Sequence, residues 1–237
     1  MTTAIEAFNI QEKGILNIIR AADIYAICLL AKFRGVDPNM EQITSILEGN
    51  RITSYNLMSM HYSKDEFIQL KEKGHFREIC QQIIFQTYTM LESYLILKFK
   101  EYYFYLTSKT THKIINESLK MFNFRSLTDL KRNYNDILDI HLPSYDFDYF
   151  YSDDKCSFKP KDSWEAINII AKARNEIAHQ GISSSYIANT LMDSWYPFDF
   201  IRRWIGSFDV NFNMLIYENR ETGLIKEYKL KRVSSKS

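Results

Sequence analysis

The amino-acid sequence predicts an all-α fold, and three observations support this prediction. Only seven glycines and four prolines occur in 237 residues, which favours long helices over a turn-rich β fold. Apolar residues recur at the three-and-four spacing of amphipathic helices over several long segments. Polar capping residues, glycines and prolines mark the places where these segments begin and end.

The first segment, from about Phe8 to Phe33, is predicted to be an amphipathic helix that ends at Gly35-Val36-Asp37-Pro38. A second, shorter helix is expected from Asn39 to Leu47, and Gly49-Asn50 stops it. The segment from Arg51 to Lys64 shows no clear period, so it is predicted to be irregular.

The strongest helical pattern extends from Phe76 to Leu106. Shorter helices are expected from Thr111 to Phe122 and from Ser126 to His141, where the pair Ser126 and Asp129 resembles a capping box. The acidic, aromatic stretch from Leu142 to Pro160 is expected to be a solvated insertion. A lid and a dimer contact are the alternatives for this stretch.

A further helix is capped by Asp162 or Ser163, includes Trp164 near its start and closes at Gly181. At about 100° per residue its apolar residues share one face. They are Ala166, Ile169, Ile170, Ala173 and Ile177. The opposite side carries a polar stripe of Asn168, Lys172, Asn175 and His179. Arg174 lies between the two faces, and its long side chain can reach out from there.

The residues from Tyr186 to Tyr196 are expected to form a short helix or an ordered loop, and Pro197 then suits the first position of a final helix. The tail from Leu224 to Ser237 is rich in Lys and Arg. A short strand, a disordered end and a nonspecific RNA contact remain open for this tail.

Charge and cysteine content limit the class of protein. The net charge is +1, so no global basic field attracts nucleic acid and any RNA contact must use a local patch. Three widely spaced cysteines favour neither a disulfide framework nor a zinc site. The N-terminus carries Glu6 where a signal peptide needs basic residues, and the apolar run from Ala21 to Ala31 is too short to span a bilayer. We therefore expect a cytoplasmic protein without membrane association.

Three chemically active residues lie together on the last turns of the helix that Gly181 closes. Arg174 and Asn175 are adjacent, and His179 follows Asn175 by four positions. Arginine presents a permanently charged fork that suits phosphate, and histidine can take and give a proton near neutral pH.

This Arg-Asn-x-x-x-His pattern resembles the signature of the HEPN domain superfamily, whose members include many metal-independent endoribonucleases. The resemblance covers about residues 76–218. It implies a HEPN-like four-helix up-and-down bundle at 66–218. Residues 1–65, which have no counterpart in the family, are expected to form an N-terminal helical extension, and 219–237 a basic C-terminal tail. The residues expected in the core are Ile84, Leu91, Leu95, Ile170, Ile177, Ile205 and Phe208.

The resemblance implies an endoribonuclease of the toxin or antiviral-defence kind, a hydrolase-class nuclease that needs neither metal nor cofactor. The 2′-hydroxyl of RNA would attack the phosphate and leave 2′,3′-cyclic phosphate and 5′-hydroxyl ends. His179 would transfer protons, Arg174 would hold the phosphate oxygens, and Asn175 would fix the His179 ring or bind phosphate. Lys172 and Glu92 are the expected supporting residues, although Glu92 could also be an ordinary boundary carboxylate.

Two arginines near the start of the final helix, Arg202 and Arg203, could add positive charge to an RNA groove or merely decorate an exposed face. HEPN ribonucleases typically form dimers, so the polar stripe is expected to face a second copy in a composite active site; a solvated face is the alternative. An antitoxin or regulatory protein is a further candidate partner. The alternative function is a noncatalytic HEPN-like dimer that serves as a ligand-binding or regulatory module, and a chance motif in another helical fold is a third option.

Overall fold

The computed structural model describes residues 3–48, 74, 76–107, 112–147, 158–186, 188 and 191–222, and these residues contain helices but no strand. The elements in chain order are α1 (Ala4–Arg34), α2 (Met40–Leu47), α5 (Arg77–Leu106), α6 (His112–Met121), α7 (Leu127–Leu138), the 3₁₀ turn η1 (Leu142–Ser144), α8 (Ser163–Gln180) and α9 (Leu191–Thr222). The all-α prediction is confirmed. The expectations for 51–64 and for the basic tail lie outside the described residues.

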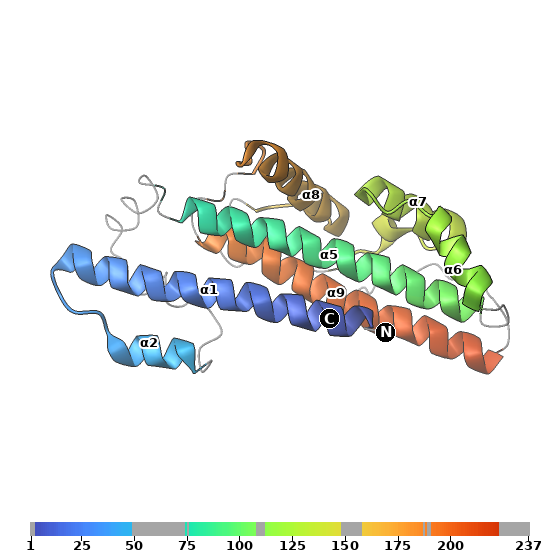
Figure 1. Cartoon of the computed structure of the whole chain (residues 1–237), viewed down its shortest axis with the longest axis horizontal. Helices are drawn as coiled ribbons and strands as arrows, with labels where there is room; N and C mark the ends of the chain where they lie inside the picture. The colour runs from blue at the N-terminus through green and yellow to red at the C-terminus, as the bar shows by residue number, and fades with distance from the viewer. Residues whose placement is uncertain are drawn as a thin grey trace.

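Three long helices, α1, α5 and α9, pack along one another, and α8 and α7 lie on the side of α5 away from α1 (Figure 1). The ring of Phe8 meets that of Tyr94, with 6.4 Å between centroids, and Tyr25 meets Phe76 at 5.8 Å. These contacts run in opposite directions along the chain, so α1 is antiparallel to α5. The Tyr94 hydroxyl donates to Asp209 on α9 and Lys98 Nζ donates to Asn213 further along it, so α9 runs parallel to α5.

The N-terminal helix α1 belongs to the same hydrophobic core as the later helices. Phe8, Ile15 and Ile19 on α1 are buried in one cluster with residues of α5, α8 and α9. The predicted extension at 1–65 therefore contains a helix that shares the bundle core, and the division near residue 65 does not separate α1 from it.

Helix α1 also satisfies a simple length and composition test for a membrane span, because one 18-residue window has a mean hydropathy of 1.7. In this structure 39% of that window is buried. Core helices of bundles meet the same test, and contact of α1 with α5 explains why its buried side is apolar.

The helix ends follow the predicted capping chemistry. Ser126 Oγ accepts a hydrogen bond from the Asp129 N–H at 3.1 Å, and the Asp162 carboxylate accepts one from the Glu165 N–H at 2.7 Å. Gly35 and Gly181 close α1 and α8 with φ of 66° and 77°, which is left-handed backbone that glycine adopts without strain.

The prediction that Pro197 opens the final helix is wrong, because α9 begins at Leu191 and contains Pro197 in its interior. Proline has no N–H, so Pro197 cannot donate to the carbonyl of Asp193 one turn earlier. The hydroxyl of Tyr186 donates to that carbonyl instead, at 2.5 Å. A side chain from the segment before α9 thus supplies the missing hydrogen bond, and the helix continues through the proline.

Six of the seven predicted core residues are buried, and Ile177 is the exception because it is only partly buried. On α8, Ile167 and Ala171 are buried although they lie outside the predicted apolar face, whereas Ile169 is partly buried. The buried side of α8 is therefore rotated from the predicted apolar face towards Arg174, and this rotation directs Arg174 to α5.

Candidate functional site

The side chain of Arg174 is held against two aromatic rings on α5. Its guanidinium carbon lies 5.3 Å from the centroid of the Phe85 ring and 5.5 Å from that of Tyr88. Such contacts attract a cation to the ring face and restrict a side chain that would otherwise sample many rotamers. Arg174 therefore has a fixed position beside α5.

The structure places Glu92 opposite Arg174, with Arg174 Nη2 and Glu92 Oε2 3.9 Å apart. Arg174 Nη1 donates a hydrogen bond to Asn175 Oδ1 at 3.0 Å. The Nε atom of Arg174 is buried without a hydrogen-bond partner among the described residues. Arg174, Asn175 and Glu92 thus form one contact group between α8 and α5, and the Asn175 oxygen here contacts Arg174, not His179.

Burial controls the ionisation of the two acidic groups around Arg174. It raises the pKa of Glu92, and the positive charge of Arg174 opposes this rise. Burial also raises the pKa of Tyr88 to about 12, with a smaller contribution from the Glu92 charge. Tyr88 therefore keeps its proton at neutral pH and presents a neutral ring and hydroxyl to Arg174.

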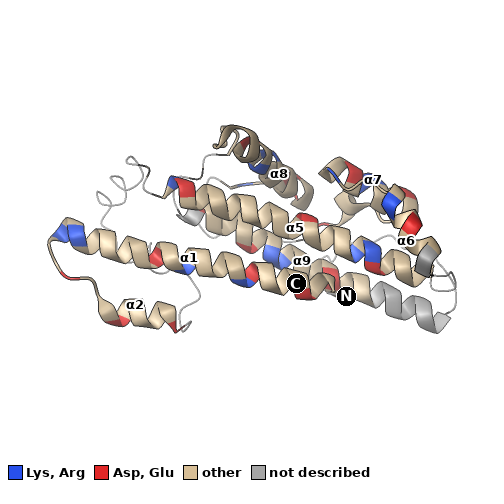
Figure 2. Ribbon diagram, viewed as in Figure 1, with Lys and Arg blue, Asp and Glu red and all other residues tan. Residues whose placement is uncertain are grey.

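A cleft of about 710 Å³ opens beside Arg174, between α5, the start of α7 and α8; we refer to it as the α8 cleft. Figure 2 shows basic positions on both α7 and α8, the helices that flank it. Its lining residues are Tyr88, Glu92, Arg125, Ser126, Leu127, Thr128, Lys131, Trp164, Asn168, Ala171, Lys172, Arg174, Asn175 and Glu176. Four basic side chains and two carboxylates therefore line one cleft.

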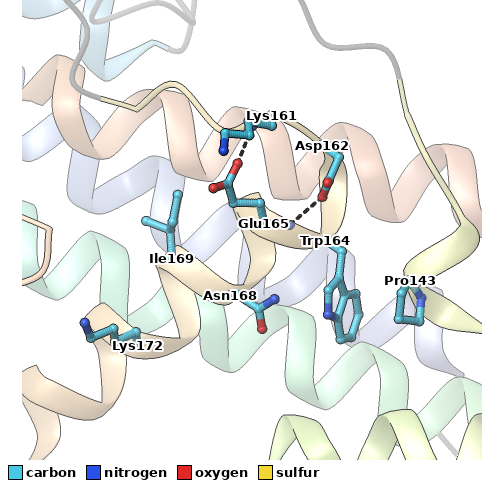
Figure 3. A pocket seen from close by; sticks show the side chains of 8 residues that line it. All are labelled: Pro143, Lys161, Asp162, Trp164, Glu165, Asn168, Ile169 and Lys172. Atoms are coloured by element: carbon cyan, nitrogen blue, oxygen red, sulfur yellow. Dashed lines mark hydrogen bonds between the residues drawn. The ribbon is translucent and has the colours of Figure 1, made fainter.

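A second hollow, of about 520 Å³, adjoins the α8 cleft near the start of α8 (Figure 3). Trp164, Asn168 and Lys172 line both hollows. The two carboxylates of the second hollow are engaged in the helix cap, because Asp162 accepts from the Glu165 N–H and Glu165 accepts from the Lys161 N–H.

The four residues of the polar stripe, Asn168, Lys172, Asn175 and His179, are all exposed. The first three line the α8 cleft, but His179 lies on the last turn of α8 and is not among its lining residues. One chain therefore brings Arg174, Asn175, Lys172 and Glu92 to the cleft and leaves His179 apart from them.

The turn that follows His179 is held by Glu176, a residue that the sequence analysis does not single out. Glu176 Oε2 accepts hydrogen bonds from Ser183 Oγ at 2.9 Å and from the N–H groups of Ser184 and Ser185 at 2.7 and 2.8 Å. These hydrogen bonds lower the pKa of Glu176 to about 2, and the bond from the Ser185 N–H has the largest effect. The carboxylate thus stays charged and fixes the chain beyond Gly181.

The predicted RNA-binding arginines of α9 lie away from the α8 cleft. Arg202 Nη2 lies 2.6 Å from Asp199 Oδ1, and Arg202 Nη1 lies 3.5 Å from Glu12 Oε1 on α1. Arg203 Nε lies 2.9 Å from Asp199 Oδ2. Asp199 precedes these arginines by three and four positions, a spacing that brings side chains together on a helix. The structure does not bring either arginine to the predicted active-site residues.

Three further cleft residues, Arg125, Lys131 and Trp164, are absent from the sequence-based site. Arg125 precedes the N-cap Ser126 of α7, Lys131 follows it within the helix, and Trp164 lies in the first turn of α8. The sequence separation between Trp164 and the two basic residues hides the fact that all three line one cleft. The pair of basic residues at the start of a helix was nevertheless a signal for an anion site that the sequence shows.

No group of three or more His, Cys, Asp or Glu residues that could hold a metal ion occurs in the part of the chain that the structure describes. No family model, no curated protein and no solved structure matches this chain. Together the fold and the site define a helical protein with a basic cleft beside an anchored arginine.

Proposed function

We propose that the chain is a metal-independent endoribonuclease with a HEPN-like bundle, acting as a toxin or in phage defence. One observation carries the proposal: Arg174, held over Phe85 and Tyr88, stands at a basic cleft together with Asn175 and Lys172. A fixed guanidinium in a partly buried position can bind a phosphate through paired, charge-assisted hydrogen bonds.

RNA supplies its own nucleophile, so few protein groups are needed. The 2′-hydroxyl loses its proton and attacks phosphorus, the bond to the 5′-oxygen breaks, and this oxygen receives a proton. His179 is suited to both proton transfers because the ordinary pKa of histidine is about 6.5. Arg174 stabilises the charge that develops on the phosphate oxygens.

The exposed position of His179 is explained by a symmetric homodimer. The polar stripe of each copy would face that of the other across a two-fold axis, as isologous interfaces require. His179 of one copy would then approach the α8 cleft of the other, and the pair of histidines would provide an acid and a base.

The experiment that tests this proposal is a cleavage assay on total RNA, with and without EDTA. Wild-type protein is expected to cleave under both conditions, and His179→Ala is expected to be inactive. His179 is exposed, so its loss leaves the fold intact, which circular dichroism checks. His141→Ala removes another exposed imidazole and serves as the matched control. Wild-type protein without activity on any RNA would contradict the proposal.

A second candidate is a noncatalytic HEPN-like dimer that acts as a ligand-binding or regulatory module. The observation in its favour is that Arg174 already contacts Glu92 and Asn175 while His179 lies outside the cleft. Wild-type protein that binds RNA in the α8 cleft and leaves it uncut would support this candidate.

A further inference from the structure

We propose that the α8 cleft binds an unpaired nucleotide of the RNA next to the cleavage site. In this subsite Trp164 stacks on the base, and Arg125, Lys131 and Lys172 bind the flanking phosphates. This inference rests on the proposed function and specifies its substrate as single-stranded RNA.

The charge of the cleft favours a phosphate chain. Its two carboxylates are occupied, because Glu92 faces Arg174 and Glu176 accepts hydrogen bonds from the turn after α8. The ion pairs between described residues include none of Arg125, Lys131 and Lys172. Arg174 and Glu92 offset each other, so Arg125, Lys131 and Lys172 outweigh the charged Glu176, and the described lining of the cleft is net positive although the whole chain carries only +1. An anion gains most where such charges converge on a partly desolvated site.

Trp164 is suited to stacking because it is the least buried of the three tryptophans: it packs against the core but also lines the cleft. Trp195 and Trp204 are buried and packed against Phe198 and Phe208, with centroids 5.7 and 4.8 Å apart. Trp164 is partly buried, lines both hollows and meets no other aromatic ring among the described residues. Its side chain extends from α8 between Asn168 and Pro143 (Figure 3).

The dimensions of the cleft favour a single strand over a duplex. Its volume of about 710 Å³ lies within the range of roughly 300–1,000 Å³ that small-ligand sites occupy. Bases in a duplex have both faces stacked, whereas an unpaired base can leave its neighbours and stack on an indole. The amide of Asn168, which is exposed beside Trp164, can then contact the base edge.

The test measures binding of a fluorescein-labelled 2′-O-methyl oligoribonucleotide, which cannot be cleaved, by anisotropy at several salt concentrations. The double variant Arg125→Ala/Lys131→Ala is expected to bind more weakly. Its slope of log affinity against log salt should fall by about 1.4, since each phosphate contact on a single strand contributes roughly 0.7. The control Lys13→Ala/Lys32→Ala removes the same charge from exposed positions on α1 and should leave the slope unchanged.

The role of Trp164 is tested in the same assay. Trp164→Ala is expected to lower the affinity about tenfold, and Trp164→Phe should retain most of it because a phenyl ring still stacks. Thermal melting of each variant checks that the fold is kept. Duplex RNA that binds wild-type protein as tightly as the single strand would overturn the stacking role.

The outcomes separate this inference from the proposed function. An unchanged salt slope in the double variant, with wild-type cleavage intact, overturns the subsite alone. Wild-type protein that cleaves no RNA but binds the oligonucleotide through Arg125, Lys131 and Trp164 overturns the nuclease and leaves the subsite standing. Competition by poly-glutamate as effective as that of unlabelled oligonucleotide would assign the cleft to an acidic protein and overturn the RNA subsite.

Discussion

Arg174 on α8 and Glu92 on α5 face each other with 3.9 Å between Nη2 and Oε2, which is an ion pair but not a hydrogen bond. A charge-assisted hydrogen bond between a guanidinium and a carboxylate would be about 2.7–2.9 Å long. The carboxylate therefore weakens the field of the guanidinium without saturating its donors. A phosphate that formed hydrogen bonds to Arg174 would compete with Glu92 for the same charge.

Glu92→Gln is expected to strengthen binding of a non-cleavable oligoribonucleotide several-fold, because it removes this competing charge. The free energy of unfolding at pH 7 should not fall, because burial raises the pKa of Glu92 and so disfavours its charged form in the folded state. Anisotropy and urea denaturation measure the two effects. Glu117→Gln, at an exposed position on α6, is the control and should change neither.

Leu91→Ala is expected to lower the free energy of unfolding by about 2–5 kcal/mol through lost burial and a residual cavity. Leu91 is fully buried in the core. The control is Leu106→Ala, the same change at the end of α5, where Leu106 is 38% exposed. Urea denaturation should assign the control a loss of less than about 1 kcal/mol. Equal losses would contradict the position of Leu91 in the core.

Much of the fold could be predicted from the sequence because its signals are local. The α5 helix begins and ends within one residue of the predicted range, and Ser126, Asp162, Gly35 and Gly181 act at the helix ends where their chemistry predicts. Periodicity and capping depend on residues within a few positions of each other. The structure departs from the prediction where contacts between residues far apart in the sequence determine the local structure.

Three such departures share one physical cause, which is packing between residues that are far apart in the sequence. Tyr186 donates to the Asp193 carbonyl and allows α9 to pass through Pro197, which no local rule for proline anticipates. The rotation of α8 depends on its packing against α5, so Arg174 faces Phe85 and Tyr88. The site residues that the motif contains were visible in the sequence, whereas the cleft wall on α7 required the tertiary arrangement.

A buried carboxylate on α1 predicts an unusual dependence of stability on pH. Asp23 is 4% exposed, its Oδ1 has no hydrogen-bond partner among the described residues, and burial raises its pKa from 3.8 to about 7. Between these two pH values the folded chain holds a proton that the unfolded chain has lost. The contribution of Asp23 to the free energy of unfolding therefore falls as pH rises through this window, by on the order of 4 kcal/mol, and does not change further above it.

Asp23→Asn is expected to remove this dependence, so the variant should match wild-type stability near pH 4 and exceed it at pH 8. Urea denaturation at pH 4, 6 and 8 measures the difference. Asp37→Asn changes an exposed carboxylate beyond the end of α1 and should leave the pH profile of the wild type unaltered. Parallel profiles for wild type and Asp23→Asn would show that Asp23 is ionised in the folded chain.

The proposed composite site requires a homodimer. Light scattering at micromolar concentration is expected to give twice the chain mass of 28.2 kDa. Asn168→Arg should weaken the dimer because it brings like charges together across the two-fold axis, whereas Asn17→Arg on an exposed part of α1 should not. A strict monomer at these concentrations would remove the composite site and favour the noncatalytic candidate.

The last prediction concerns the chemistry at Arg174. Arg174→Lys is expected to lose most of the cleavage activity, although the charge is kept, because an ammonium cannot present paired hydrogen bonds to a phosphate. Arg132→Lys on the exposed face of α7, where the side chain is 58% exposed, is the matched control and should cleave as the wild type does. Circular dichroism checks that both variants retain their helices.

The products of the same reaction identify the nucleophile. Attack by the neighbouring 2′-oxygen leaves a 2′,3′-cyclic phosphate on one fragment and a 5′-hydroxyl on the other, so polynucleotide kinase should label the 5′ ends without prior phosphatase treatment. EDTA should not change the rate, because the proposed steps use only Arg174, His179 and the RNA itself. Fragments with a 5′-phosphate would show that water is the nucleophile, and cleavage that depends on magnesium would contradict the metal-independent steps proposed for Arg174 and His179.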